Sequence, residues 1–275
     1  RLKDGHCVLA ALEVDVLLKY LLNIDQATLI TQLVLPVEAD VITRFDVLLN
    51  RRLSGEPLDY IVGCSEFLGR SFKVRPGVLI PRSETELLVQ TTQQWLSDII
   101  TSNGGSQFVA CECGFGSGVI SLSLALAFPD ISWQAFDIDS EAVACATENA
   151  RLLKVRSVTW HQQDFFKGVE MFCNQEKPFV VVANPPYIPT AEVVMLDASV
   201  RDFEPKVALD GGTDGLVFYK QLFQKFYKEK AWLFLECGQG QMPNLRSLGM
   251  DYGFECKDVQ KDLQGIERVG VFKKG

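Results

Sequence analysis

The sequence predicts an α/β protein in which a doubly wound, mostly parallel sheet follows a small helical domain. Three observations carry this prediction. Short strand-like segments alternate with helical segments from residue 83 onward. A glycine-rich loop follows the first of those strands, and the apolar residues before residue 56 recur at helical spacing. The 275 residues suffice for one large domain and one small one.

We expect a helical N-terminal domain over residues 1–58. Apolar residues recur at helical spacing between His6 and about Gly55, in "VLAALEVDVLLKYLL", "ATLITQLVL" and "DVITRFDVLLNRRL". Residues 59–82 change character, because short β-rich runs surround Gly69-Arg70 and Pro76-Gly77. This pattern predicts a β-hairpin linker.

The third segment, residues 83–275, is expected to hold the sheet. Ser83-Glu84-Thr85-Glu86 has the pattern of a capping box, in which the Ser83 hydroxyl accepts from a helical N–H and Glu86 reaches back, so a helix should begin there. Strands are then expected at 108–113, 132–138, 157–161, 179–184 and 232–237, with helices at 117–128, 140–153, 216–227 and 241–248. The chain ends in two strand candidates without a helix between them, which predicts an antiparallel pair.

Charge and composition argue against several function classes. The formal net charge is -8, and residues 76–275 carry eighteen Lys and Arg against twenty-five Asp and Glu. This balance opposes sequence-independent binding to DNA, which depends on basic side chains, so we expect no direct nucleic-acid binding. No stretch reaches the roughly 18 uninterrupted apolar residues of a membrane span. We also expect no secretory signal at the start of the sequence.

The eight cysteines are expected to be reduced. They lie scattered, mostly in apolar segments, without a CxxC pair or neighbouring histidines. Cys111 and Cys113 fall on one face of their expected strand, but zinc would need further ligands nearby, so we expect no metal site. Together with the absence of an export signal, these cysteines indicate a cytoplasmic protein.

The loop "CGFGSG" places Gly114, Gly116 and Gly118 between the first sheet strand and a helix. Glycines there let the backbone turn tightly and approach a ligand at the N–H groups of the helix. A dinucleotide site would need a further glycine at the position of Val119. The spacing therefore favours S-adenosylmethionine as the ligand over a dinucleotide.

Carboxylates follow the next two strands. Asp137 lies nineteen residues after Gly118, at the end of the second strand, where a carboxylate can accept both ribose hydroxyls. Asp139 is the competing carboxylate, but its position suits the start of the next helix. After the third strand, Asp164 could accept from an adenine amino group and Phe165 could lie against the purine.

The fourth strand, "FVVVAN", ends in Asn184-Pro185-Pro186-Tyr187. Its apolar character indicates burial on both faces, so its carboxyl end should meet the ligand crevice. The prolines hold the chain rigidly, and the Asn184 side-chain oxygen and the Pro185 carbonyl can accept the two hydrogens of an NH2 group. Tyr187 would cover that planar group. The turn predicts methyl transfer to nitrogen, with the choice between an amide and a base amine open at this point.

Longer segments around these motifs resemble the release-factor glutamine methyltransferases, the HemK or PrmC family of class I S-adenosylmethionine-dependent enzymes. The resemblance rests on "GEPLDYIVGCSEFLGRSFKV", "VLIPRSETELLV", "ALDGGTDGLVFYKQL" and "LFLECGQGQ", in the family's order. It implies a Rossmann-like domain whose seven-stranded, mostly parallel sheet has an antiparallel final strand, after a helical domain that docks the substrate. The implied substrate is the glutamine of the Gly-Gly-Gln motif of peptide chain release factors, whose methylation tunes translation termination.

The resemblance also implies roles for residues. The cofactor S-adenosyl-L-methionine, which leaves as S-adenosyl-L-homocysteine, would contact Glu112, Gly114, Phe115, Gly116, Ser117, Gly118, Asp137, Asp164, Phe165 and Asn184. Asn184, Pro185, Pro186 and Tyr187 would bind the substrate, with Asn184, Pro185 and Tyr187 catalytic. Arg82 to Glu86 would border the active site, in a chain expected to be a monomer. Departures from the family pattern are Ser83, Glu112, Cys113, Phe115 and Cys237.

Two other functions share part of this pattern. A methyltransferase acting on an exocyclic amine of DNA or RNA could use the same turn, but it should show a basic face, and only Arg51-Arg52 forms a modest basic cluster. A module that binds the cofactor without turnover would not need the Asn184 to Tyr187 turn. The sequence therefore favours glutamine methylation.

Overall fold

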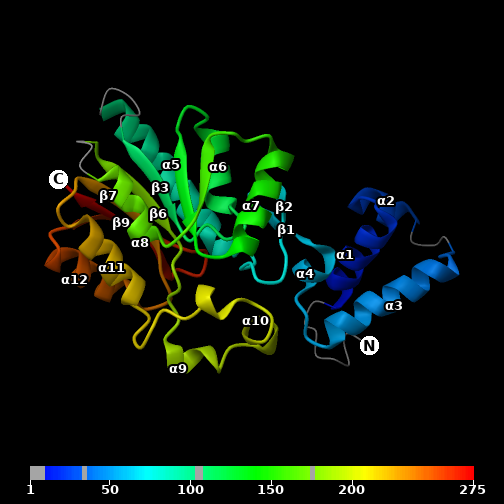
Figure 1. Ribbon diagram of the computed structural model, residues 1–275. Helices are drawn as coiled ribbons and strands as arrows, with labels where there is room; N and C mark the ends of the chain where they lie inside the picture. Colours follow the sequence, from blue (N-terminus) through cyan, green and yellow to red (C-terminus); the bar gives the residue numbers. More distant parts are fainter. Residues whose placement is uncertain (1–9, 33–35, 103–107, 174–176) are drawn as a thin grey trace.

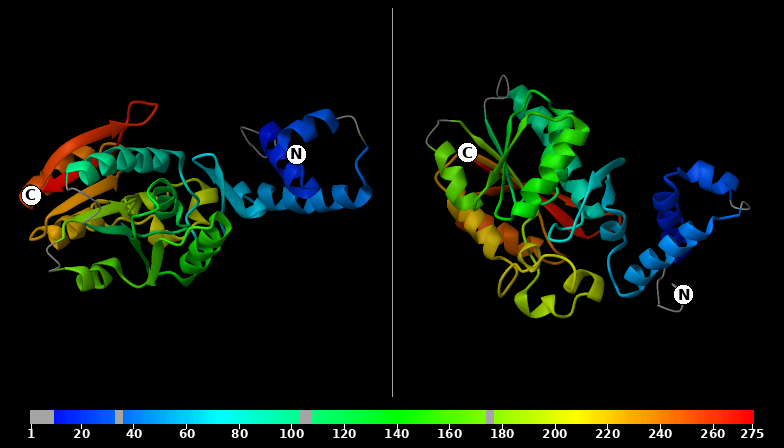
Figure 2. Two further views of the ribbon diagram at one scale, coloured as in Figure 1. Left: turned by 90° about the horizontal axis from the view of Figure 1, so that it is seen from above. Right: turned by 45° about the vertical axis from the view of Figure 1, so that its right-hand side comes forward.

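The computed structural model describes residues 10–32, 36–102, 108–173 and 177–275 (Figure 1). It begins with helices that lie to one side of the sheet (Figures 1 and 2). They are α1 (Ala10–Leu22), α2 (Gln26–Gln32), α3 (Ala39–Leu53) and α4 (Leu58–Val62). The helical character expected of this region is confirmed, whereas the start expected near His6 lies outside the described residues.

Buried apolar side chains hold these helices together. Leu17 on α1 is fully buried and packs with Ile61 and Val62 of α4. Arg52 of α3 adds two hydrogen bonds of 2.9 Å to the Glu13 carboxylate of α1. The sequence did not predict α4, because its five residues are too few to display a helical repeat.

The expected hairpin consists of β1 (Cys64–Phe67) and β2 (Arg70–Lys73), which pair antiparallel. Leu68 and Gly69 form its turn with φ of 48° and 68°, the positive values that such two-residue turns need. On α5 (Ser83–Ser102), the Glu86 carboxylate accepts from the Leu68 N–H at 2.7 Å. The capping box expected at Ser83 is therefore wrong, because Glu86 serves the hairpin turn and the Ser83 hydroxyl donates to Glu84.

Seven strands form the main sheet in the order β5-β4-β3-β6-β7-β9-β8. Neighbouring strands are parallel except around β9, which is antiparallel to both of its neighbours. This confirms the expected sheet with one antiparallel final strand. The strands are β3 (Val109–Cys113), β4 (Trp133–Asp137), β5 (Val158–Gln162), β6 (Phe179–Ala183), β7 (Ala231–Glu236), β8 (Glu255–Lys261) and β9 (Glu267–Lys274).

Helices cover both faces of the sheet (Figure 1). One face carries α5, α6 (Val119–Ala127) and α7 (Ser140–Leu153), and the other carries α8 (Phe165–Gly168), the 3-10 turn η1 (Val169–Phe172), α11 (Val217–Phe226) and α12 (Met242–Asp251). In β6, Val180 and Val182 pack toward α5 and α6, whereas Val181 and Ala183 pack toward α11 and α12. The double burial expected of this strand is thus confirmed. None of the helices in the described ranges combines the length and apolar character of a membrane span.

The carboxyl ends of the central strands meet at one level. Cys113 lies opposite Phe136 and Ala183, and Ala183 lies opposite Leu235. The glycine loop after β3 and the turn after β6 are therefore neighbours at the edge where open parallel sheets bind their ligands. The chain between β6 and α11 adds the short elements α9 (Thr190–Val193), α10 (Ala198–Arg201) and η2 (Lys206–Ala208).

Candidate functional site

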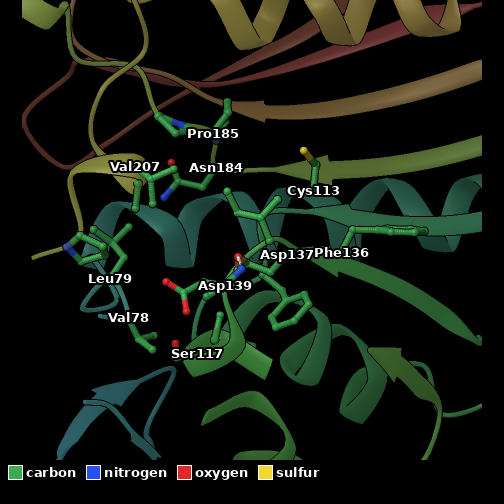
Figure 3. A pocket seen from close by; sticks show the side chains of 18 of the residues that line it. Val78, Leu79, Cys113, Ser117, Phe136, Asp137, Asp139, Asn184, Pro185 and Val207 are labelled. Atoms are coloured by element: carbon green, nitrogen blue, oxygen red, sulfur yellow. Dashed lines mark hydrogen bonds between the residues drawn. The ribbon is translucent and has the colours of Figure 1, made fainter. Parts of the chain in front are cut away.

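A cavity of about 230 Å³ lies at the carboxyl edge of the sheet (Figure 3). Its wall brings together the stretch before α5, the loop after β3, the residues after β4 and β5, and the turn after β6. The expected site residues that line it are Gly114, Phe115, Gly116, Ser117, Asp137, Asp164, Phe165, Asn184, Pro185 and Pro186. Arg82 and Thr85 also line it, whereas Glu112, Gly118 and Tyr187 lie behind the wall.

The three glycines of the loop have different surroundings. The backbone φ angles of Gly114, Gly116 and Gly118 are 74°, 52° and 81°, values that residues other than glycine rarely adopt. A Cβ added at Gly114 or Gly116 would meet no described atom within 4 Å, so bare backbone faces open space there. A Cβ at Gly118 would come within 2.9 Å of the Trp160 ring. The first two glycines therefore shape the cavity, and the third permits close packing beneath the loop.

Asp137 ties the loop to the end of β4. Its carboxylate accepts from the Gly116 N–H at 2.9 Å and from the Asp139 N–H at 3.0 Å. Burial raises the pKa of Asp137, and these two N–H groups oppose the rise. Each carboxylate oxygen keeps a further lone pair, so Asp137 can still accept from a ligand hydroxyl.

Two other carboxylates begin helices. Asp139 accepts from the Glu141 N–H at 2.8 Å at the start of α7, which confirms the position expected for it. Asp164 accepts from the Lys167 N–H at 3.0 Å at the start of α8. Both also line the cavity, so they add negative charge to its wall.

Aromatic rings form the apolar part of the cavity. Phe165 is buried and packs perpendicular to Phe136, with ring centroids 5.5 Å apart. Ile138 and Phe166 extend this apolar wall. Such a wall suits a flat, aromatic part of a ligand.

Glu112 lies elsewhere than the sequence places it. Alternation along β3 turns its side chain away from the face of Cys113 and toward α6, where it accepts from the Ser121 N–H at 3.0 Å and from the Ser121 hydroxyl. Its second oxygen has no partner among the described residues. Burial raises the pKa of Glu112 to about 8. The carboxyl group therefore supports the start of α6 from behind the cavity wall.

Phe115 also points into the protein. Its ring is buried against Trp160, with centroids 4.8 Å apart, and packs with Ala142 and Ala146 of α7. The residue borders the cavity within the loop, but the bulk of its side chain fills the core beneath it.

The turn after β6 presents acceptors to the cavity (Figure 3). The Asn184 Nδ2 donates to the Thr85 hydroxyl oxygen at 3.0 Å. No hydrogen bond between described residues ends on Asn184 Oδ1 or on the Pro185 carbonyl. Both oxygens can therefore accept from a ligand. The ring of Tyr187 is partly buried and packs among the residues on the α11 and α12 face.

Residues from two distant segments support this turn from behind. Gln241 Nε2 donates to the Tyr187 carbonyl at 2.8 Å, while its Oε1 accepts from the Gly238 N–H at 2.9 Å. Gly211 and Gly215 pack against the turn so closely that a Cβ at Gly211 would lie 2.7 Å from the Pro186 carbonyl oxygen. Sequence reasoning assigned these residues no role. These residues lie in "ALDGGTDGL" and "LFLECGQGQ", two of the segments that carry the family resemblance, and that resemblance could have pointed to them.

The cysteines do not form a recognisable metal centre within the described residues. The seven cysteines there are free, and no group of three or more His, Cys, Asp or Glu side chains in that part of the chain could hold a metal ion. Cys7 lies outside the described residues.

Comparisons with known proteins find similar domains and similar chains. The PrmC N-terminal domain model matches residues 1–63, and the methyltransferase small domain model matches residues 85–201. A release factor glutamine methyltransferase from Thermodesulfovibrio yellowstonii is 36% identical over 231 residues, which cover 82% of this chain and 80% of that protein. Another from Moorella thermoacetica is 36% identical over 273 residues, which cover 98% and 93%.

A solved structure shares the fold. The catalytic domain of hMettl16, determined in complex with MAT2A 3'UTR hairpin 6, has a TM-score of 0.55 at 14% identity and covers 83% of this chain and 91% of its own. At this identity the likeness concerns architecture alone. The sequence relatives carry the assignment, because their identity extends over most of both chains. The chain belongs to the release factor glutamine methyltransferase family.

Proposed function

We propose that this release factor glutamine methyltransferase transfers the methyl group of S-adenosylmethionine to the side-chain amide nitrogen of the glutamine in the Gly-Gly-Gln motif of peptide chain release factors. One observation carries the proposal. Asn184, whose Oδ1 is available to accept, lines the same cavity as the glycine loop and Asp137. An acceptor for an NH2 group thus lies beside residues suited to the cofactor.

The residues of the cavity fit S-adenosylmethionine. Asp137 would hold the ribose hydroxyls through its remaining lone pairs. The bare backbone of Gly114 and Gly116 leaves room for the methionine part of the cofactor. The apolar wall at Phe165 suits adenine, and Asp164 could accept a hydrogen bond from the adenine amino group. The carboxylates in the wall also favour a cation, because opposite charges attract strongly where water is excluded.

Asn184 and Pro185 would orient the substrate. Asn184 Oδ1 and the Pro185 carbonyl would each accept one N–H of the glutamine amide, and the two prolines hold these acceptors rigidly. The cofactor supplies a methyl group on a sulfonium, so the nitrogen–carbon bond forms as the sulfur–carbon bond breaks, S-adenosylhomocysteine remains and the nitrogen releases a proton to water. A glutamine amide is barely basic, so alignment and electrostatics do most of the work.

The helices before residue 59 would dock the release factor. Support comes from a hollow between these helices and the segment after β6, which is lined by Leu12, Arg52, Asp59 and Glu204 among others. Arg82 lines both this hollow and the cavity. A protein seated on the helical domain would therefore have a short path to Asn184.

The test is transfer of labelled methyl from S-adenosylmethionine by the purified chain. Three acceptors are compared: a release factor, the same factor with the glutamine of its Gly-Gly-Gln motif replaced by alanine, and total RNA. We expect label on the first alone. Label on RNA, with none on the glutamine, would overturn the proposal in favour of an exocyclic amine as the substrate.

A further inference from the structure

Buried polar groups form a chain behind Asn184. The Asn184 Nδ2 donates to the Thr85 hydroxyl oxygen at 3.0 Å. Burial raises the pKa of Glu236 to about 7, and a hydrogen bond from the Thr85 hydroxyl to the Glu236 carboxylate opposes this rise. Thr85 is 3% exposed and Glu236 is 1% exposed. Bulk water therefore has little access to either group, and the three side chains depend on one another.

The fold brings these residues together from three elements. Asn184 follows β6 and Glu236 ends β7 at adjacent positions, because Ala183 lies opposite Leu235. Alternation turns both side chains toward α5, since Val182 and Phe234, two residues earlier in each strand, pack on that face. Thr85 lies in the first turn of α5 and meets them there.

The chemistry of the three groups gives the chain one direction. Above its pKa of about 7, Glu236 is an ionised carboxylate that only accepts hydrogen bonds, so it takes the single proton of the Thr85 hydroxyl. The Thr85 oxygen is then left to accept, and it can accept only from the NH2 side of the Asn184 amide. The Asn184 oxygen consequently faces the other way, toward the cavity.

Without this chain the amide could turn over. If the Thr85 proton were free, it could donate to Asn184 Oδ1, and the Asn184 NH2 would then face the substrate. Two NH2 groups would confront each other, and neither could accept. A rotation of one side chain by half a turn would thus remove the acceptor on which methyl transfer depends.

We propose that Thr85 and Glu236 are positioning residues that fix the sense of the Asn184 amide, so that its oxygen faces the substrate. This rests on the proposed function, in which Asn184 accepts from an NH2 group of the substrate. Glu236 lies behind the cavity wall, and it acts through Thr85. One of its oxygens has no partner among the described residues, although burying a polar atom unpaired is costly. Its role in ordering Asn184 explains why a carboxyl group occupies this site.

The first experiment removes the Thr85 hydroxyl while keeping the shape of the side chain. At a pH above the pKa of Glu236, we expect the kcat/KM of T85V for the protein substrate to fall about 10- to 100-fold, because a misplaced Asn184 amide costs one hydrogen bond to the transition state. The Kd for S-adenosylmethionine, measured by calorimetry, should stay within about twofold of the wild type. T85S should restore most of the lost turnover, because it keeps the hydroxyl.

A matched control is available on the same helix. Thr92 is fully buried, and its hydroxyl donates only within α5, to the Leu88 carbonyl at 2.7 Å. T92V therefore removes the same atoms without touching Asn184 and should keep wild-type turnover. Wild-type turnover in T85V would overturn the proposal. So would a T85V variant that loses cofactor affinity and thermal stability in step with turnover, because that pattern indicates general damage.

The second experiment tests whether Glu236 acts through Thr85. E236L removes the carboxylate, and the double variant T85V/E236L should lose no more turnover than T85V alone. If the double variant instead loses turnover by the product of the two single-variant factors, Glu236 acts separately from Thr85. Failure of the proposed substrate would be distinguishable: if the wild type labelled an RNA amine instead of glutamine, the same variants compared on RNA would still decide whether the chain positions Asn184.

Discussion

Replacing Glu112 by glutamine should change how the stability of the protein depends on pH. The Glu112 side chain is fully buried, one of its oxygens accepts from Ser121, and the other has no partner among the described residues. Burial is the main cause of its raised pKa of about 8, and the two hydrogen bonds from Ser121 oppose it. In the folded protein the group is therefore largely protonated at neutral pH.

The sign of the effect follows from proton binding. The folded pKa of about 8 lies above the ordinary value of 4.5, so between these values the folded state binds one more proton than the unfolded state. The free energy of unfolding must then fall as pH rises through this window. Between pH 6 and pH 8 the loss from this group is about 2 kcal/mol, at 1.36 kcal/mol for each unit of pKa shift. Glutamine does not titrate, so E112Q should lack this part of the decline.

Urea denaturation at pH 6 and pH 8 measures the difference. The free energy of unfolding of the wild type should fall by about 2 kcal/mol more than that of E112Q across this interval. Burial also raises the pKa of Glu236, to about 7, and the decline due to that group remains in both proteins. E192Q, which removes a carboxylate from an exposed position on α9, serves as the control and should follow the wild type. Equal declines in E112Q and the wild type would refute the reasoning. The Kd of E112Q for S-adenosylmethionine should also be nearly unchanged, because Glu112 lies behind the cavity wall.

Three further substitutions test the site. N184A should bind S-adenosylmethionine nearly as well as the wild type but lose most turnover; calorimetry that shows lost cofactor binding would contradict this division of roles. D137A should raise the Kd for S-adenosylmethionine about tenfold or more, since it loses hydrogen bonds to the ribose, and an unchanged Kd would count against that role. G215A should lower both turnover and Tm, the latter by roughly 5 °C, because a Cβ there collides with the Tyr187 carbonyl. Gly240 has a similar positive φ, but a Cβ there would meet no described atom within 4 Å, so G240A reports backbone strain without the collision. Equal effects of G215A and G240A would argue against support of the turn by Gly215.

The sequence predicted the parts of the site that depend on strand order. Parallel strands present their carboxyl ends at one edge, so the spacing from Gly118 to Asp137 and the apolar run before Asn184 were enough to place these residues together. Their joint presence in the cavity wall agrees with that argument. The same strand alternation that groups Cys111 with Cys113 also turns Glu112 away from them, so its position behind the wall could have been predicted as well.

Other contacts depended on partners that are distant in the sequence. Glu86 fits a local capping pattern, but its carboxylate meets the Leu68 N–H of the hairpin, and no local rule predicts that approach. Thr85 and Glu236 meet only because β6 and β7 pair in one register and α5 crosses their ends. Local motifs thus predict which residue types line the cavity, whereas the groups that hold them in place follow from the assembled sheet.

This difference bears on what the family segments encode. The Asn184 to Tyr187 turn could clamp an amide or a base amine, since both present two N–H groups. The segments that distinguish this family contribute residues that contact the turn or Asn184 from behind, namely Thr85, Gly211, Gly215 and Gln241. They also contribute Glu236, which interacts with Thr85. Such contacts hold the two hydrogen-bond acceptors in place, but they do not distinguish an amide from a base amine by its shape. We therefore propose that discrimination between glutamine and a base arises where the substrate approaches, at the helical domain and the hollow beside Arg82.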